Sequence, residues 1–169
     1  MKNVRRTTMS ETDAPHVLPF AIEPALSLAA CNIRDLIDEV GAKLTARLHA
    51  QRVVFEMNVP SDLQVSADRG MLLRALTSLM HNALDSMPRG GELVITGYAG
   101  RLGVELEVAD SGPGLPASSA TLDTVVPGLS QVRRFAAMHG GDVMAANCPE
   151  GGAAFTIRLP CRRSETRAA

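Results

Sequence analysis

Three polar side chains share one face of a predicted helix. Ser78, Asn82 and Asp85 are spaced by four and three residues, so all three project from the same side. An amide beside the buried side of a helix needs hydrogen-bond partners, and its oxygen can instead bind a hydrated cation. Asn82 is therefore either a structural residue or a metal ligand, and this helix alone leaves both interpretations open.

A glycine-rich loop two strands further along the chain adds a second group of candidates. Asp110 ends a predicted strand, where its carboxylate can accept a hydrogen bond in the floor of a pocket. Gly112 and Gly114 follow, and a flat ligand can approach them closely because they have no Cβ. The pattern D-x-G-x-G is weak by itself, since Gly-Pro turns are common. Its position after an Asn-bearing helix and two strands makes the combined pattern far more specific than the loop alone.

Periodicity predicts the elements that position these residues. Asn32 is a good N-cap for a helix with apolar residues at helical spacing up to Leu48, and Asp68 can cap the helix that carries Asn82. The third predicted helix runs from about Gly128 to His139 and ends at Gly140-Gly141. Alternating or short β-rich runs predict six strands. These are Val53–Val59, Leu63–Ser66, Glu92–Tyr98, Val104–Ala109, Asp142–Asn147 and Ala153–Leu159.

The predicted order is a helix followed by two strands, repeated three times. Adjacent strand pairs favour antiparallel pairing, and three helices with one apolar stripe each can cover one face of a sheet. We therefore expect an α+β fold, a two-layer α/β sandwich with a mixed, mostly antiparallel sheet. Residues 21–31 are rich in Ala and Leu and are compatible with a short helix interrupted at Pro24, without a firm assignment. The expected organisation is a flexible tail over 1–20, one domain over 21–161, and a second tail over 162–169.

Composition limits the class of protein. The 169 residues are 46% hydrophobic and 21% charged, with a net charge of −1, as in a soluble globular domain. This balance gives no reason to expect a nucleic acid partner. The cysteines are widely spaced and include no C-x-x-C pair, which favours a reduced, cytoplasmic environment over a zinc site or a disulfide framework. No apolar run approaches the length of a membrane span.

Four motifs in order resemble sensor histidine kinases, notably those of the nitrogen-regulatory type. Residues 79–87, LMHNALDSM, resemble the N box, and residues 110–116, DSGPGLP, resemble the first glycine box. Residues 128–134, leading to His139-Gly140-Gly141, are similar to the second box and its helix. Residues 150–160 are similar to the closing hairpin. The resemblance extends from about Ile33 to Pro160.

This resemblance implies the Bergerat ATP-binding fold, with ATP and Mg²⁺ as cofactors. Asn82 would then hold Mg²⁺, and Asp110 would accept a hydrogen bond from the adenine amino group. The resemblance also assigns nucleotide-binding positions to Gly112 and Gly114 in the adenine pocket, to Gly128 and Leu129 on the phosphate side, and to Asp85 beside Asn82.

The sequence departs from the family pattern at several positions. Ser78 stands where an Asn or acidic residue usually precedes the Mg²⁺ ligand by one turn, and Ala153 replaces a frequent Thr or Ser. The second glycine box keeps only Gly128, after Val125, Val126 and Pro127. No His-Glu-x-[Arg/Asn] phosphoacceptor motif surrounds any of the four histidines, which we interpret as surface or structural residues.

Two functions remain open from the sequence. The leading one is the catalytic domain of a two-component histidine kinase, inactive alone, which donates the ATP γ-phosphoryl group to a histidine on a separate phosphoacceptor (dimerisation) domain within a response-regulator system. The alternative is a degenerate module that binds a nucleotide or a protein and has no transfer activity. A chaperone-type ATPase is disfavoured because no acidic residue precedes Asn82 by one turn.

Overall fold

The computed structural model describes residues 26–115 and 126–160. The described helices are α1 (Ile33–Gln51), α2 (Arg69–Ser86) and α4 (Leu129–Met138). The strands are β1 (Leu28–Asn32), β2 (Val53–Asn58), β3 (Gln64–Asp68), β4 (Gly91–Ala99), β5 (Gly103–Asp110), β6 (Asp142–Asn147) and β7 (Ala153–Pro160). No helix in these ranges is both long and apolar enough to cross a membrane. The predicted tails, and with them the predicted domain boundaries, lie outside the described residues.

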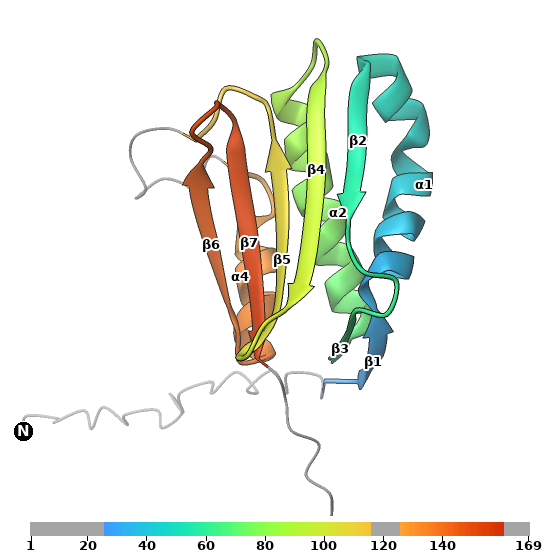
Figure 1. Cartoon of the computed structure of the whole chain (residues 1–169), viewed down its shortest axis with the longest axis vertical. Coiled ribbons are helices and arrows are strands. Elements are labelled where there is room, and N and C mark those ends of the chain that lie inside the picture. The colour runs from blue at the N-terminus through green and yellow to red at the C-terminus, as the bar shows by residue number, and fades with distance from the viewer. Residues whose placement is uncertain (1–25, 116–125, 161–169) are drawn as a thin grey trace, which may run out of the picture.

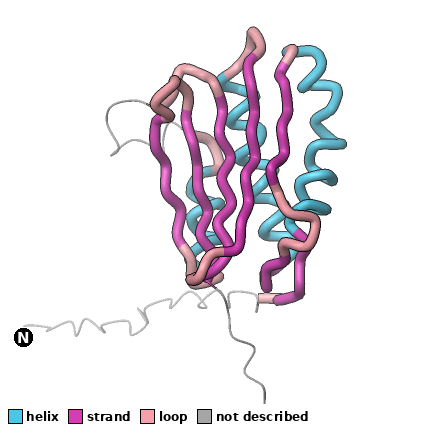
Figure 2. The backbone as a smooth tube through the Cα atoms, viewed as in Figure 1, coloured by secondary structure: helices cyan, strands magenta, loops and turns pink. Residues whose placement is uncertain are grey.

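Five strands form the main sheet in the order β2-β4-β5-β7-β6, and the helices cover one of its faces (Figure 1). The backbone trace shows the same two layers, with the strands in front and the helices behind them (Figure 2). Only the β2–β4 pair is parallel among these neighbours. The predicted α+β sandwich with a mixed, mostly antiparallel sheet is therefore confirmed.

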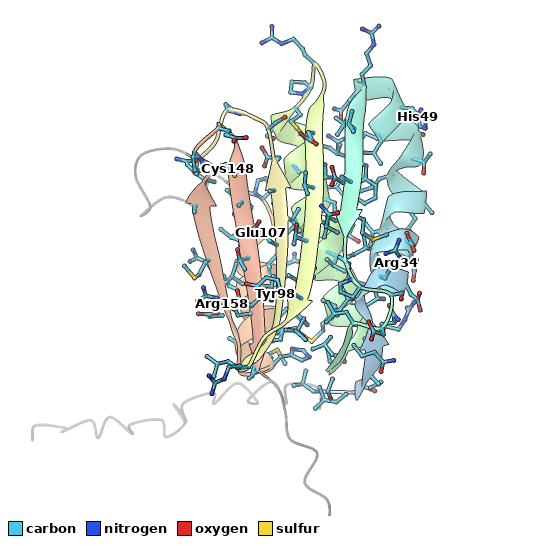
Figure 3. All side chains as sticks on the ribbon, viewed as in Figure 1. Arg34, His49, Tyr98, Glu107, Cys148 and Arg158 are labelled. Atoms are coloured by element: carbon cyan, nitrogen blue, oxygen red, sulfur yellow. The ribbon has the colours of Figure 1, made fainter. Side chains whose placement is uncertain are left out.

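The other face of the sheet is exposed and carries several polar side chains, together with the exposed side chains of Val54 and Met144. Tyr98, Glu107 and Arg158 project from it on the side away from the helices (Figure 3). Tyr98 donates a hydrogen bond of 2.8 Å to Glu105, which also lies 3.6 Å from the Arg158 guanidinium. These cross-strand contacts occupy a layer separate from the apolar core, which lies between the sheet and the helices.

Antiparallel pairing of adjacent strands was the wrong expectation for β2 and β3. These two strands do not pair; β2 runs parallel to β4, with Val53 opposite Gly91, and β3 pairs with β1 in a separate two-stranded sheet. The reason is the helix between them. Because α2 returns the chain across the sheet before β4 begins, β2, α2 and β4 form a crossover unit that favours parallel strands.

The possible short helix within residues 21–31 is not found where the chain is described. Leu28–Asn32 form β1 instead, antiparallel to β3 over five residue pairs. Ala and Leu are good helix formers, but intrinsic propensity is a small free-energy term, and pairing with a distant strand overrides it. Cys31 on this strand is buried, and burial raises the pKa of its thiol.

The two predicted N-caps are confirmed. The side chain of Asn32 accepts a hydrogen bond of 3.2 Å from Asp35 N–H at the start of α1. Asp68 does the same for α2, accepting 3.0 Å from Met71 N–H. That hydrogen bond is the main reason why the pKa of the Asp68 carboxyl is lowered. Both caps fix where helices of the core layer begin.

His139 joins the C-terminus of α4 to the N-terminus of α2. Its side chain is 2% exposed, its Nδ1 lies 2.7 Å from Phe135 O, and its Nε2 accepts 2.9 Å from Asp68 N–H. Because Nε2 is the acceptor, the ring proton lies on Nδ1 and donates to the carbonyl. The interpretation of His139 as a satisfied structural histidine is confirmed.

Candidate functional site

One cavity of about 350 Å³ contains several of the predicted site residues. It lies where α2 passes the ends of β5 and β7 and the segment that leads into α4. Its lining residues are Asn82, Asp85, Ser86, Asp110, Gly114, Leu115, Val126, Pro127, Ala153 and Phe155. We call the part formed by Ser86, Asp110, Gly114, Leu115, Ala153 and Phe155 the sheet end, and the part formed by Asn82, Val126 and Pro127 the helix end.

A buried carboxylate forms the floor of the sheet end. Asp110 is 8% exposed and ends β5 between Leu93 of β4 and Ala153 of β7. Its Oδ1 accepts 2.8 Å from Gly112 N–H and lies 3.0 Å from Ser86 Oγ. Both contacts fall on the same oxygen, so Oδ2 is the atom that could accept a hydrogen bond from a ligand.

Gly112 is required for this arrangement. A Cβ at position 112 would lie 2.5 Å from Ser86 Oγ and 2.7 Å from Asp110 Oδ1, closer than real contacts allow. The missing side chain lets the loop backbone reach the carboxylate directly. Gly112 therefore acts beneath the cavity, where it holds Asp110, whereas Gly114 lines the cavity itself.

Asn147, which sequence reasoning did not select, holds the next part of the loop. Its side-chain oxygen accepts 2.6 Å from Leu115 N–H, and its amide nitrogen donates 3.4 Å to Leu115 O. This two-pronged contact ties the loop after β5 to the end of β6. Such a contact joins residues distant in sequence, and no local pattern indicates it.

The helix end is built around the carbonyl oxygen of Pro127. Asn82 Nδ2 donates to it at 2.8 Å, and Ser78 Oγ lies 3.5 Å away. Because the amide nitrogen of Asn82 is used in this way, its oxygen Oδ1 is the atom that could bind a cation. No group of three or more His, Cys, Asp or Glu side chains in the described ranges could hold a metal ion. A cation here would depend on Asn82, on waters and on an anionic ligand, which suits Mg²⁺.

Gly128 and Leu129 have different surroundings. Gly128 adopts φ +74°, and a Cβ there would overlap Ser78 Oγ, so the small side chain at position 78 and the glycine fit one another. Gly128 thereby lies against the helix that carries Asn82. The side chain of Leu129 is fully buried in the core at the start of α4 and is not part of the cavity lining.

Asp85 lies on the cavity wall and faces a cation from another helix. Its side chain is 61% exposed, and its Oδ1 accepts a hydrogen bond from Arg47 Nη2 on α1. Of the predicted site residues, Asn82, Asp85, Asp110 and Gly114 thus line one cavity, and Gly112 and Gly128 support its two ends. Sequence reasoning missed Ser86 and Phe155. The sequence contained a pattern for both. Ser86 follows Asn82 by four residues, on the same face of the helix, and Phe155 points to the same side of its strand as Ala153.

The sequence profile of the histidine kinase-, DNA gyrase B- and HSP90-like ATPases matches residues 67–163. Histidine protein kinase DivJ of Caulobacter vibrioides is 35% identical over 119 residues, which cover 60% of this chain and 19% of DivJ. The chain thus spans about one fifth of that curated relative.

Solved structures agree in fold. The catalytic domain of histidine kinase ThkA superposes with a TM-score of 0.72 at 26% identity, over 79% of this chain and 95% of that domain. Full-length ShkA in complex with AMPPNP gives a TM-score of 0.70 at 30% identity, over 83% of this chain and 32% of ShkA.

Proposed function

Because the chain belongs to the family of histidine kinase-, DNA gyrase B- and HSP90-like ATPases, we propose that it is the ATP-binding catalytic domain of a cytoplasmic two-component sensor histidine kinase. It donates the γ-phosphoryl group of ATP to a histidine on a separate phosphoacceptor domain. The observation that carries the proposal is Asp110, a buried carboxylate with one oxygen fixed by the protein and the other available at the floor of a cavity.

The sheet end suits an adenine ring. Oδ2 of Asp110 would accept from the exocyclic amino group, which is a donor. Leu115, Ala153 and Phe155 supply apolar surface around a flat base. Gly112 N–H and Ser86 hold the carboxylate in place before a ligand arrives, which lowers the entropic cost of binding. A guanine would present a carbonyl oxygen to Asp110 at this position, so the site favours adenine.

The helix end suits the phosphate groups and a magnesium ion. Asn82 Oδ1 would be the protein ligand, with the Asn82 amide oriented by Pro127. When bound, Mg²⁺ neutralises phosphate charge and so favours phosphoryl transfer. Helix α4 begins directly after Gly128, and the partial positive charge of its N-terminus favours an anion nearby. The N–H groups of Leu129 and Gln131 already donate to Val126 O and Gly128 O, so this charge is the main contribution of the helix start.

The phosphoacceptor would belong to another domain or chain. His139 uses both ring nitrogens inside the fold, and His81 Nδ1 lies 3.0 Å from Arg47 Nη1. Neither His49 nor any other histidine of the chain has the acceptor motif. A histidine phosphorylated on a separate domain would then pass the phosphoryl group to a response regulator. ThkA, a relative in fold, has been captured in complex with the response regulator TrrA.

A second candidate is a nucleotide- or protein-binding module without transfer activity. Ser78 and the segment Val126-Pro127 favour it. A serine hydroxyl is a poor base, and Pro127 has no N–H to donate to a phosphate. Both candidates allow nucleotide binding, so transfer of the γ-phosphoryl group to an added phosphoacceptor domain distinguishes them. Transfer supports the kinase, and nucleotide binding without transfer supports the second candidate.

Calorimetric titration with ATP and adenosine, with and without Mg²⁺, tests the proposal. Asp110→Asn should weaken both ligands by about 1–3 kcal/mol, because the carboxylate accepts from Gly112 N–H and from adenine on different oxygens, whereas an amide has only one acceptor oxygen. Asn82→Ala should weaken ATP roughly tenfold in Mg²⁺ and leave adenosine nearly unchanged. Equal losses of both ligands in Asn82→Ala would make Asn82 a structural residue, and unaltered affinity in Asp110→Asn would overturn the adenine assignment.

A further inference from the structure

Arg47 reaches from α1 to α2 and contacts two residues that flank Asn82. Its Nη1 lies 3.0 Å from His81 Nδ1, and its Nη2 donates to Asp85 Oδ1. A guanidinium can only donate, so His81 Nδ1 is the acceptor and the ring carries its proton on Nε2. His81 and Asp85 are four residues apart on the same face of α2, so one arginine fixes both.

The charge of Asp85 matters because of where it lies. Asp85 lines the cavity and follows Asn82 by three residues, roughly 5 Å along the helix axis. Phosphate groups bound at the helix end would therefore meet a carboxylate of the same sign nearby. An unpaired carboxylate would repel them, whereas a carboxylate paired with a cation would not. Arg47 is the cation that the structure supplies, and its side chain is 30% exposed.

We propose that Arg47 is a specificity-determining residue of the nucleotide site, which acts by pairing with Asp85 so that the cavity accepts a phosphorylated nucleotide. The inference rests on the proposed function, because it assumes that phosphates bind at the helix end. It predicts a dependence on phosphate charge: Arg47 matters most for ATP, less for ADP and least for adenosine. Arg47 lies outside every sequence motif of the site, and its contact with Asp85 is what connects it to the cavity.

The chain offers a matched control in a second ion pair between the same two helices. Arg69 at the start of α2 lies 2.6 Å from Glu39 on α1, and Glu39 also pairs with Lys43 at 2.8 Å. Neither Arg69 nor Glu39 lines the cavity. Arg69→Ala therefore removes an exposed α1–α2 ion pair of the same kind at a distance from the proposed ligand, and any effect of general helix docking should appear in both variants.

The test is calorimetry of the full chain with adenosine, ADP and ATP at low ionic strength. We expect Arg47→Ala to weaken ATP roughly three- to tenfold, ADP less, and adenosine less than twofold, with the ATP effect reduced at high salt. Arg47→Ala combined with Asp85→Ala should recover most of the ATP affinity, because the repelling carboxylate is gone. Arg47→Lys keeps the charge and should fall between the parent and Arg47→Ala. Arg69→Ala should leave all three affinities within twofold of the parent.

Several outcomes would overturn the inference. Equal weakening of adenosine and ATP in Arg47→Ala would mean that Arg47 only docks the helices. A double variant no better than Arg47→Ala would mean that Asp85 does not repel the phosphates. If Arg47→Ala fails to fold, Arg47→Lys and Asp85→Ala decide by the same comparison of ligands. If the parent binds none of the three ligands, the proposed function itself is contradicted, and the inference about Arg47 is contradicted as well.

Discussion

The two ends of the cavity are held in different ways. At the sheet end, Asp110 belongs to a central strand, and its carboxylate is fixed by Gly112 N–H and by Ser86. At the helix end, Asn82 and Ser78 both approach a single carbonyl oxygen, that of Pro127. Recognition built on a sheet is more rigid than recognition that depends on a connecting segment. We therefore expect base recognition to be strong relative to phosphate recognition, with weak overall affinity for ATP, roughly 10 µM to 1 mM.

The largest loss of nucleotide affinity is expected from a substitution at the sheet end. Gly112→Ala would place a Cβ between Ser86 and Asp110, and one of them must move. We expect nucleotide affinity to fall by about 100-fold or more, for adenosine as much as for ATP, because the carboxylate loses its position. Gly100→Ala is the matched control, since the nearest atom to a Cβ there is 3.6 Å away in the loop after β4. Unchanged adenosine binding by folded Gly112→Ala would contradict the account of this end.

A substitution at the helix end should cause a smaller loss of affinity, and only for ligands that carry phosphate groups. Gly128→Ala puts a side chain at φ +74° and against Ser78 Oγ. The left-handed conformation costs about 1 kcal/mol for alanine. The overlap is relieved if Ser78 Oγ rotates and gives up its contact with Pro127 O, or if the segment with Pro127 moves away from Asn82. We expect ATP affinity to fall several-fold and adenosine affinity to change little.

The variant Gly128→Ala with Ser78→Ala separates these two causes. Removal of the hydroxyl relieves the overlap but leaves the backbone conformation unfavourable. Partial recovery of ATP affinity, measured in the same titration, is the expected result. No recovery would mean that the fit between Ser78 and Gly128 does not control the position of Pro127.

The sequence predicted the parts of the molecule that local patterns determine. Asn32 and Asp68 were identified as caps because capping depends on neighbouring residues. The pairing of β1 with β3 was missed, since it joins segments more than 30 residues apart and no periodicity encodes it. At the site, the motifs selected Asn82 and Asp110. They could not select Asn147 or Arg47, whose roles arise from contacts across the fold.

A glycine in place of Val126 at the helix end should change ATP affinity by a smaller amount than the substitutions above. Val126 is buried, lines the cavity and accepts 3.2 Å from Leu129 N–H through its carbonyl. Val126→Gly frees the backbone to turn an amide N–H toward a phosphate. One added hydrogen bond should raise ATP affinity roughly two- to tenfold.

The unmodified parent should bind ATP and ADP with affinities within about threefold of one another, because its helix end contributes little to phosphate binding.

The same change removes a buried side chain, so the melting temperature of Val126→Gly should fall. Calorimetry gives the affinities, and a thermal scan without ligand gives the stability. Nanomolar ATP binding by the parent, or a glycine variant with no gain for ATP, would show that the replaced glycines do not weaken the helix end.

The smallest effect on the nucleotide is expected at Asp68, although this residue affects stability. It caps α2 about 20 Å from Asn82 along the helix. Its pKa is lowered mainly by the hydrogen bond from Met71 N–H and further by other backbone N–H groups, against a cost of desolvation. A carboxyl whose folded pKa lies below its unfolded value near 3.9 stabilises the fold above that pH. The contribution is lost as the pH falls through the lower folded value.

Asp68→Asn isolates this contribution, because asparagine also caps helices well but does not titrate. We expect the melting temperature of the variant to lie a few degrees below that of the parent at pH 7, and the difference to shrink as the pH falls below about 4. ATP and adenosine affinities at pH 7 should remain within twofold of the parent. A difference in melting temperature that stays constant down to pH 3 would mean that the charge of Asp68 does not stabilise α2. A large loss of ATP affinity would mean that the start of α2 and the helix end of the cavity are coupled, through the contact between Asp68 and His139 at the end of α4.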